Sequence, residues 1–136
     1  MKVGIYPMVA DILHTGHLSA IEEAKNHCDY LIIALHCCPN YKKPIQTIFE
    51  RYMQLRAVKW VDEIIPYTDV NDAATMLSSV HYDIYFLGED HRNTQWECCD
   101  LIQKLGKEVY YLERKHNLSS TDVKTRILNK ENKNDN

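Results

Sequence analysis

The sequence predicts a single α/β domain, a three-layer α/β/α sandwich with a mostly parallel five-stranded sheet. Short runs rich in β-branched and aromatic residues alternate along the chain with longer segments of helical periodicity. The run at residues 30–35 is apolar throughout, as is typical of a central strand covered on both faces. Strands that alternate with helices are joined by right-handed crossovers, so we expect parallel strands with helices on both faces of the sheet.

The expected elements follow one another regularly. Strands are predicted at residues 3–6, 30–35, 63–65, 82–87 and 108–112. Helices are predicted at residues 18–26, 48–60, 71–80 and 94–105, and a last one begins after Ser119. Gly106 follows the fourth helix, where a glycine suits a left-handed cap. One domain is expected over residues 1–128, whereas residues 129–136 contain no apolar side chain and are expected to be a disordered polar tail.

The composition is that of a globular protein, with 136 residues, of which 45% are hydrophobic and 26% charged. No apolar run approaches the ~20 residues of a membrane span, and the first residues indicate a strand, not an export signal. A net charge of -3 favours neither nucleic acid nor an anionic membrane as a partner. The five cysteines match no disulfide framework and no metal-site spacing, so reduced thiols and a cytoplasmic location are expected.

The segment between the first strand and the first helix has the clearest chemical pattern. It reads Asp-Ile-Leu-His-Thr-Gly-His over residues 11–17 and places His14 and His17 on one face where the helix begins. Gly16 lets a ligand approach the backbone closely, and the N-terminus of a helix attracts anions. Two imidazole donors aimed at one phosphorus suit nucleotidyl transfer. A lone His-x-x-His pattern is more often a pair of exposed polar residues, so the neighbouring motifs decide between these interpretations.

Four motifs in the same order resemble the cytidylyltransferases of the His-x-Gly-His nucleotidyltransferase superfamily, of which the bacterial glycerol-3-phosphate cytidylyltransferases are closest in length. They are the segment at residues 11–17, Glu-Arg-Tyr at 50–52, Trp-Val-Asp-Glu-Ile-Ile-Pro at 60–66, and Arg114 followed by Leu-Ser-Ser-Thr at 118–121. The resemblance covers residues 3–128 and implies a Rossmann-like fold with its ligand at the carboxyl ends of the strands. The chain departs from the family at residues 8–10, where Met-Val-Ala replaces the usual Gly-x-Phe, and at residues 37–39, which read Cys-Cys-Pro.

The resemblance also implies roles for particular residues. His14 and His17 would donate hydrogen bonds to the α-phosphate, while Lys42, or Lys43 in its place, and Arg114 would neutralise the triphosphate. The residues expected to bind the nucleotide are Asp11, Gly16, Gly88, Glu89, Asp90, Leu118, Ser119, Ser120 and Thr121. Asp11 has three open interpretations, as an orienting partner of His14, as a magnesium ligand or as a contact of the acceptor. Arg51 is expected to pair with an acid near the site, or to form a salt bridge on the helix surface.

The implied reaction is the transfer of CMP from CTP, with Mg²⁺, to a small phosphorylated alcohol, giving a CDP-alcohol and pyrophosphate. Glycerol 3-phosphate is the first expectation for the acceptor, and phosphoethanolamine, phosphocholine and a hydroxyalkyl phosphonate are alternatives. The resemblance also implies a homodimer. Two other functions stay open at this point. One is adenylyl transfer from ATP, because Leu-Ser-Ser-Thr is close to a segment of related adenylyltransferases, and the other is a non-catalytic nucleotide-binding module.

Overall fold

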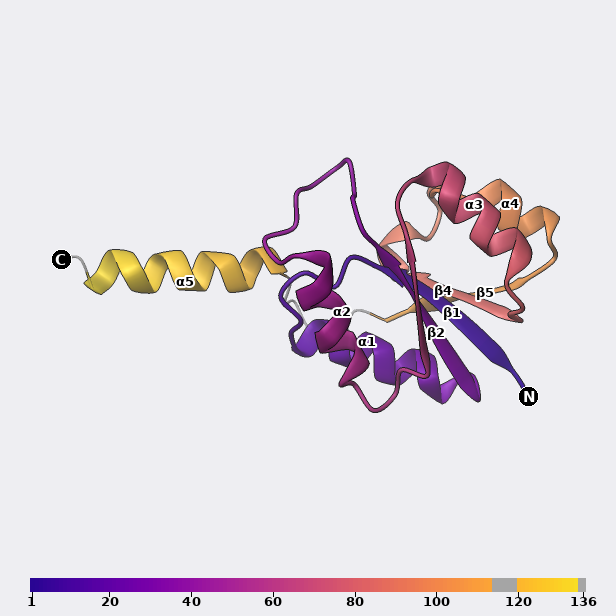
Figure 1. Ribbon diagram of the computed structural model, residues 1–136, viewed down its shortest axis with the longest axis horizontal. Coiled ribbons are helices and arrows are strands. Elements are labelled where there is room, and N and C mark those ends of the chain that lie inside the picture. The colour runs from indigo at the N-terminus through magenta and orange to yellow at the C-terminus, as the bar shows by residue number, and fades with distance from the viewer. Residues whose placement is uncertain (114–119, 135–136) are drawn as a thin grey trace.

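A computed structural model describes residues 1–113 and 120–134, and in this part of the chain a five-stranded sheet lies between two layers of helices (Figure 1). The strands are β1 (Val3–Met8), β2 (Tyr30–His36), β3 (Glu63–Tyr67), β4 (Ile84–Gly88) and β5 (Glu108–Leu112). The helices are α1 (Thr15–Asn26), α2 (Ile48–Arg56), α3 (Val70–Ser79), the short 3-10 helix η1 (Glu89–His91), α4 (Cys99–Lys104) and α5 (Ser120–Asn134). Neighbouring strands pair in parallel, which confirms the predicted sandwich.

The order of the strands places the ends of β1 and β4 at the centre of the sheet. This order is β3-β2-β1-β4-β5, so the chain moves outward from β1 to β3 and then crosses back to β4 on the other side of β1. The strand order therefore reverses between β1 and β4. In open parallel sheets a ligand binds at this point, outside the carboxyl ends of the strands. The loop from β1 to α1, which contains the two histidines, begins at this position.

Each face of the sheet buries its own apolar cluster. Along β2 the side chain of Ile32 packs on the side of α3 and α4, whereas those of Leu31 and Ile33 pack on the side of α1 and α2. Figure 1 shows these two helix pairs on opposite sides of the sheet. Successive side chains of a strand point to opposite faces, so a central strand covered on both faces needs the continuous apolar run that the sequence shows.

Several element boundaries differ from those expected from the sequence: β1 and β3 each extend two residues further, and three other differences have a clear cause. Helix α2 ends at Arg56 and not at residue 60, because Trp60 leaves the helix and packs against the apolar cluster of α1 and α2. Strand β4 begins two residues late, because Tyr82 is buried ahead of it and donates its hydroxyl hydrogen to the carbonyl of Leu77 at 2.8 Å. Helix α4 is shortened to six residues, because Cys98 adopts a left-handed conformation with φ of 68°.

The polar end of the chain also differs from its expected disorder. Helix α5 continues through Asn134, so residues 129–134 are helical, and Figure 1 shows the helix projecting away from the sheet. The expectation considered only burial, but Lys130 and Glu131 favour a helix even in water, and they continue a helix whose preceding residues include Arg126 and Leu128. Within residues 1–113 and 120–134, no helix combines the length and the apolar character that a membrane crossing requires.

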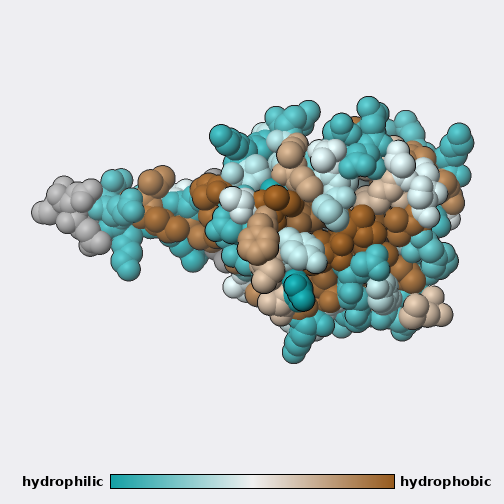
Figure 2. Space-filling view, viewed as in Figure 1, coloured by the Kyte–Doolittle hydropathy of each residue, from teal (hydrophilic) through white to brown (hydrophobic). Residues whose placement is uncertain are grey.

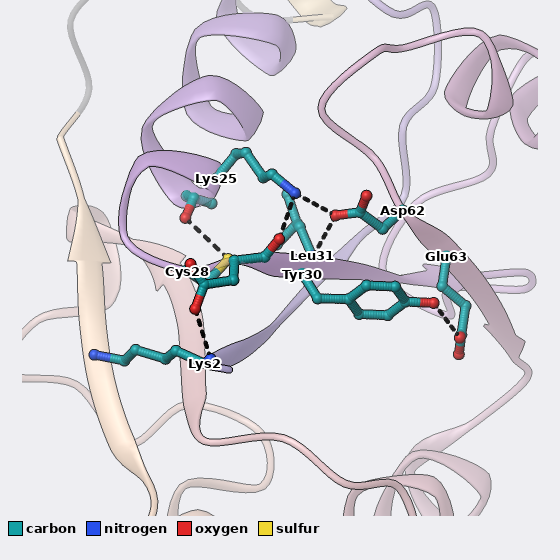
Figure 3. Close-up of polar contacts among 9 residues, drawn as sticks. Lys2, Lys25, Cys28, Tyr30, Leu31, Asp62 and Glu63 are labelled. Atoms are coloured by element: carbon teal, nitrogen blue, oxygen red, sulfur yellow. Dashed lines mark hydrogen bonds and ion pairs between the residues drawn. The ribbon is translucent and has the colours of Figure 1, made fainter.

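Polar contacts join the amino ends of the strands, at the edge of the sheet opposite the loop from β1 to α1 (Figure 3). Asp62, directly before β3, accepts hydrogen bonds from the backbone N–H of Leu31 at 2.7 Å and from the ammonium group of Lys25 at 2.5 Å. The hydroxyl of Tyr30 donates to the carboxylate of Glu63 at 2.8 Å. These contacts align β2 with β3 and leave the carboxyl ends of the strands for a ligand.

Candidate active site

Backbone N–H groups orient the two histidine rings at the start of α1. His14 is the N-cap of this helix, and its Nδ1 accepts the N–H of Gly16 at 3.0 Å. The Nδ1 of His17 accepts the N–H of His14 at 3.2 Å, and the two rings stack with centroids 4.0 Å apart. An Nδ1 that accepts a hydrogen bond carries no proton, so each neutral ring has its hydrogen on Nε2. The Gly16 N–H is therefore used within the motif.

Burial lowers the pKa of both imidazoles. For His17 the pKa falls to about 4, because the ring is desolvated and because His14 and Lys42 add positive potential. For His14, burial lowers the pKa, and the effects of Asp122, which raises it, and Lys42, which lowers it further, are smaller. The Nε2 of His14 is buried and has no hydrogen-bond partner in the described part of the chain. Such an N–H marks a position that a ligand oxygen can occupy.

The loop before the histidines has a strained backbone. Ala10 and Ile12 have φ angles of 58° and 51°, a region that is especially unfavourable for β-branched Ile12. The N–H of Ile12 donates to the side-chain oxygen of Gln46 at 2.7 Å. In return, the Asp11 carboxylate accepts the N–H groups of Ile45 at 3.0 Å and Gln46 at 2.9 Å. The segment before α2 thus holds the strained loop in place.

Asp11 is fully buried, and the helix α5 supplies a cation to it. The ammonium group of Lys124 lies 3.0 Å from the carboxylate of Asp11. Burial raises the pKa of Asp11, but the N–H groups of Gln46 and Ile45 and the charge of Lys124 together outweigh it and lower the pKa. Asp11 therefore stays ionised and links three segments that are distant in sequence. We did not predict Lys124, because nothing in the sequence pairs it with a residue 113 positions away.

Arg51 binds backbone carbonyl groups, so its expected pairing with an acid is wrong for the described residues. Its guanidinium group is buried and donates to the carbonyl oxygens of Val9 at 3.0 Å, His36 at 2.8 Å, Cys37 at 2.8 Å and Gln46 at 3.3 Å. Five donors in a planar group allow one side chain to satisfy several carbonyls at once. Arg51 therefore joins the carboxyl ends of β1 and β2 beneath the site.

The structure brings several of the other predicted residues to the same edge of the sheet. Lys42 lies on the exposed loop between β2 and α2, and its charge lowers the pKa of both histidines. Gly88 ends β4, and Glu89 and Asp90 follow it on η1 at the surface. Arg114, Leu118 and Ser119 lie outside the described residues. The side chains of Ser120 and Thr121 do as well, although their backbone begins α5.

Comparison with known proteins agrees with this arrangement. The sequence profile of the family described as "Cytidylyltransferase-like" matches residues 5–126. The chain is 30% identical to "Glycerol-3-phosphate cytidylyltransferase" of Bacillus subtilis, over 86% of this chain and 90% of that protein. It is also 30% identical to "Ethanolamine-phosphate cytidylyltransferase" of Mus musculus, over 87% of this chain and 30% of that protein. Among solved structures, a lipopolysaccharide core biosynthesis protein from Thermoplasma volcanium superposes with a TM-score of 0.70 at 28% identity, over 85% of this chain and 97% of the other.

Proposed function

The chain belongs to the cytidylyltransferase-like family, and from this premise we propose that it transfers CMP from CTP to a small phosphorylated alcohol. The products are a CDP-alcohol and pyrophosphate. The observation that carries the proposal is the pair of stacked imidazoles, each with its Nδ1 occupied by a backbone N–H. The relatives that act on glycerol 3-phosphate and on ethanolamine phosphate, by their names, support the same reaction for this chain.

In the proposed step, an oxygen of the acceptor phosphate forms a bond to the α-phosphorus of CTP. The bond from this phosphorus to the bridging oxygen breaks, and pyrophosphate leaves with the electron pair. Charge on the non-bridging oxygens is stabilised by the Nε2 hydrogens of His14 and His17. Both rings are already oriented before CTP arrives, so little reorganisation accompanies the reaction. The neutral form of the rings is favoured by the burial that lowers their pKa values.

In this proposal, the remaining predicted residues bind the other parts of the nucleotide. Lys42 and Arg114 neutralise the triphosphate, which carries the largest negative charge of the substrate. Segment 118–121, whose last two residues begin α5, binds the β- and γ-phosphates in this proposal, because the N-terminus of a helix attracts anions. Segment 88–90, at the end of β4, contacts the cytosine end.

We also propose that CTP binds together with Mg²⁺, which would reduce the negative charge of the triphosphate. In residues 1–113 and 120–134, no group of three or more metal-ligating side chains gathers. The carboxylate of Asp11 accepts two backbone N–H groups and pairs with Lys124, so it fits a linking role better than that of a metal ligand. The triphosphate itself would therefore supply most of the ligands of the ion.

Two further parts of the proposal concern the surroundings of the enzyme. A homodimer is supported by apolar side chains over α2 and along α5 (Figure 2), with Phe49 68% exposed and Leu128 58% exposed. A cytoplasmic location is supported by the five cysteines, all of which are free thiols.

The first experiment measures pyrophosphate release with each of the four ribonucleoside triphosphates against a panel of small phosphates and phosphonates. We expect turnover with CTP and one class of phosphorylated alcohol. In His14→Ala and His17→Ala, kcat should fall by about 10²–10³-fold, with a much smaller change in the KM for CTP, because each ring acts mainly in the transition state. Turnover with ATP only, or near-normal turnover of His17→Ala, would contradict the proposal.

A further inference from the structure

A cavity with aromatic walls opens beside the proposed phosphate site. It has a volume of about 210 Å³ and lies at the carboxyl ends of the strands, between the sheet and α3. Met8 and Val9, which line it, lead directly into the loop that carries the histidines. A cavity of about 150 Å³ already admits benzene, so this one holds an organic group of several heavy atoms. Its position suits the alcohol part of the acceptor, with the acceptor phosphate directed toward His14 and His17.

The walls of the cavity present the faces and edges of rings. Tyr67 stacks on His36 with centroids 4.6 Å apart, and Tyr85 stacks on Trp96 with centroids 5.2 Å apart. Tyr41 meets the edge of His36 at 6.0 Å. All five rings line the cavity. Aromatic faces attract cations, and quaternary ammonium groups are recognised by such cages in other proteins.

The charge around the cavity is negative. Among the described residues that line it, no lysine or arginine is present, and Glu97 is the one carboxylate. Its field raises the pKa of Tyr41, Tyr67 and Tyr85, in each case after burial, which is the larger cause. His36 is kept neutral by burial, which lowers its pKa, so it does not offset the carboxylate.

The cavity is also held rigidly. The guanidinium group of Arg51 donates to the carbonyls of Val9 and His36, two residues of the wall. On the other side, the left-handed backbone of Cys98 ends the segment that carries Trp96 and Glu97. A preformed cage loses little free energy to ordering when a ligand enters.

We propose that the acceptor is a phosphorylated amino alcohol, whose cationic nitrogen sits among the rings of Tyr67, Tyr85 and Trp96 and faces Glu97. This inference rests on the proposed cytidylyl transfer and names the substrate class of the same site. Glycerol 3-phosphate has no cation for this cavity, and its hydroxyl groups would exchange water for aromatic faces.

The test compares kcat/KM for four acceptors: phosphocholine, phosphoethanolamine, glycerol 3-phosphate and 3,3-dimethylbutyl phosphate, which has the shape of phosphocholine without its charge. We expect at least one cationic acceptor to exceed both neutral compounds by about 10–100-fold, as a cation–π cage with a carboxylate provides. Phosphocholine and phosphoethanolamine then distinguish a quaternary from a primary ammonium group. A preference for either neutral compound would overturn the inference and leave the proposed reaction intact.

Matched variants assign the effect to the cavity. Glu97→Gln should raise the KM of the cationic acceptor about five- to tenfold and leave glycerol 3-phosphate within twofold, while Glu22→Gln on the exposed face of α1 changes neither. Tyr67→Phe keeps an aromatic face and should retain the preference, whereas Tyr67→Leu should lose it, with thermal melts confirming that both variants fold. Equal kinetics of Glu97→Gln and Glu22→Gln would contradict the assignment.

A binding measurement separates the inference from the reaction. Calorimetric titration of phosphocholine and of 3,3-dimethylbutyl phosphate, with a non-hydrolysable CTP analogue present, should show tighter binding of the cation. Absence of pyrophosphate release with every acceptor would contradict the proposed function alone. Equal affinity for the two compounds would contradict the cationic acceptor even if the enzyme is active.

Discussion

At the scale of single residues, two backbone hydrogen bonds determine which ring nitrogen of His14 and of His17 carries the proton. The N–H of Gly16 and the N–H of His14 point at the Nδ1 atoms of His14 and His17. Each neutral ring consequently has its hydrogen on Nε2.

This arrangement predicts the titration of His17. We expect a neutral ring with its hydrogen on Nε2 at pH 7 and a midpoint at about 4, measured by long-range ¹H–¹⁵N correlation spectra. The same ring in the unfolded chain takes up a proton near pH 6.5. Lowering the pH from 6.5 to 4 therefore favours the unfolded chain and should lower the free energy of unfolding by up to about 3 kcal/mol. A midpoint near 6.5, or a hydrogen on Nδ1 at pH 7, would contradict the geometry.

At the scale of elements, the site depends on contacts between loops and the first turns of a helix. Asp11 receives two N–H groups from the segment before α2 and the ammonium group of Lys124 from α5. The start of α5 is therefore fastened to the loop that carries the histidines, even though the rest of this helix projects away from the sheet (Figure 1).

Lys124→Met tests this attachment. Without the ammonium group, the negative charge of the buried Asp11 carboxylate has fewer stabilising partners. The free energy of unfolding, measured in urea, should therefore fall by about 1–2 kcal/mol. Backbone amides in the first turns of α5 should also exchange faster with deuterium. Lys130→Met, on the exposed part of the same helix, is the matched control. Identical exchange and stability in the two variants would show that the ion pair does not hold α5.

At the scale of the whole molecule, the two ends of the sheet have different tasks. The amino ends are joined by Asp62, Lys25 and neighbouring groups (Figure 3). The carboxyl ends carry the two histidines, the loop between β2 and α2 that contains Lys42, and the aromatic cavity. Stability and chemistry are thus separated by the length of the strands, which is typical of parallel sheets.

Asp62→Ala should lower stability without changing the reaction. The substitution removes the side-chain acceptor of the N–H of buried Leu31. The free energy of unfolding, measured in urea, should therefore fall by about 1–3 kcal/mol. The values of kcat and KM at a temperature where the variant is folded should match those of the natural chain. Asp100→Ala, at an exposed position of α4, controls for the loss of a carboxylate. A tenfold change in kcat would show that the two ends are coupled.

Much of the fold and part of the site follow from local patterns. The alternation of apolar runs and helical periodicity predicted all five strands, although β4 starts later than expected and α4 is shorter. These errors occur at Tyr82 and Cys98, where packing of a side chain or a strained backbone overrides the periodicity. The histidine motif was predictable because its hydrogen bonds join residues only two or three positions apart.

The sequence alone was enough to determine the layers, the parallel sheet and the histidine motif, because each depends on neighbours along the chain. Only the tertiary structure decided that Arg51 binds carbonyls, that Lys124 reaches Asp11, and that rings from three strands and two loops enclose one cavity with Glu97. Those contacts join residues tens of positions apart. They depend on how the packed strands and loops meet in space, and no spacing within the sequence records that.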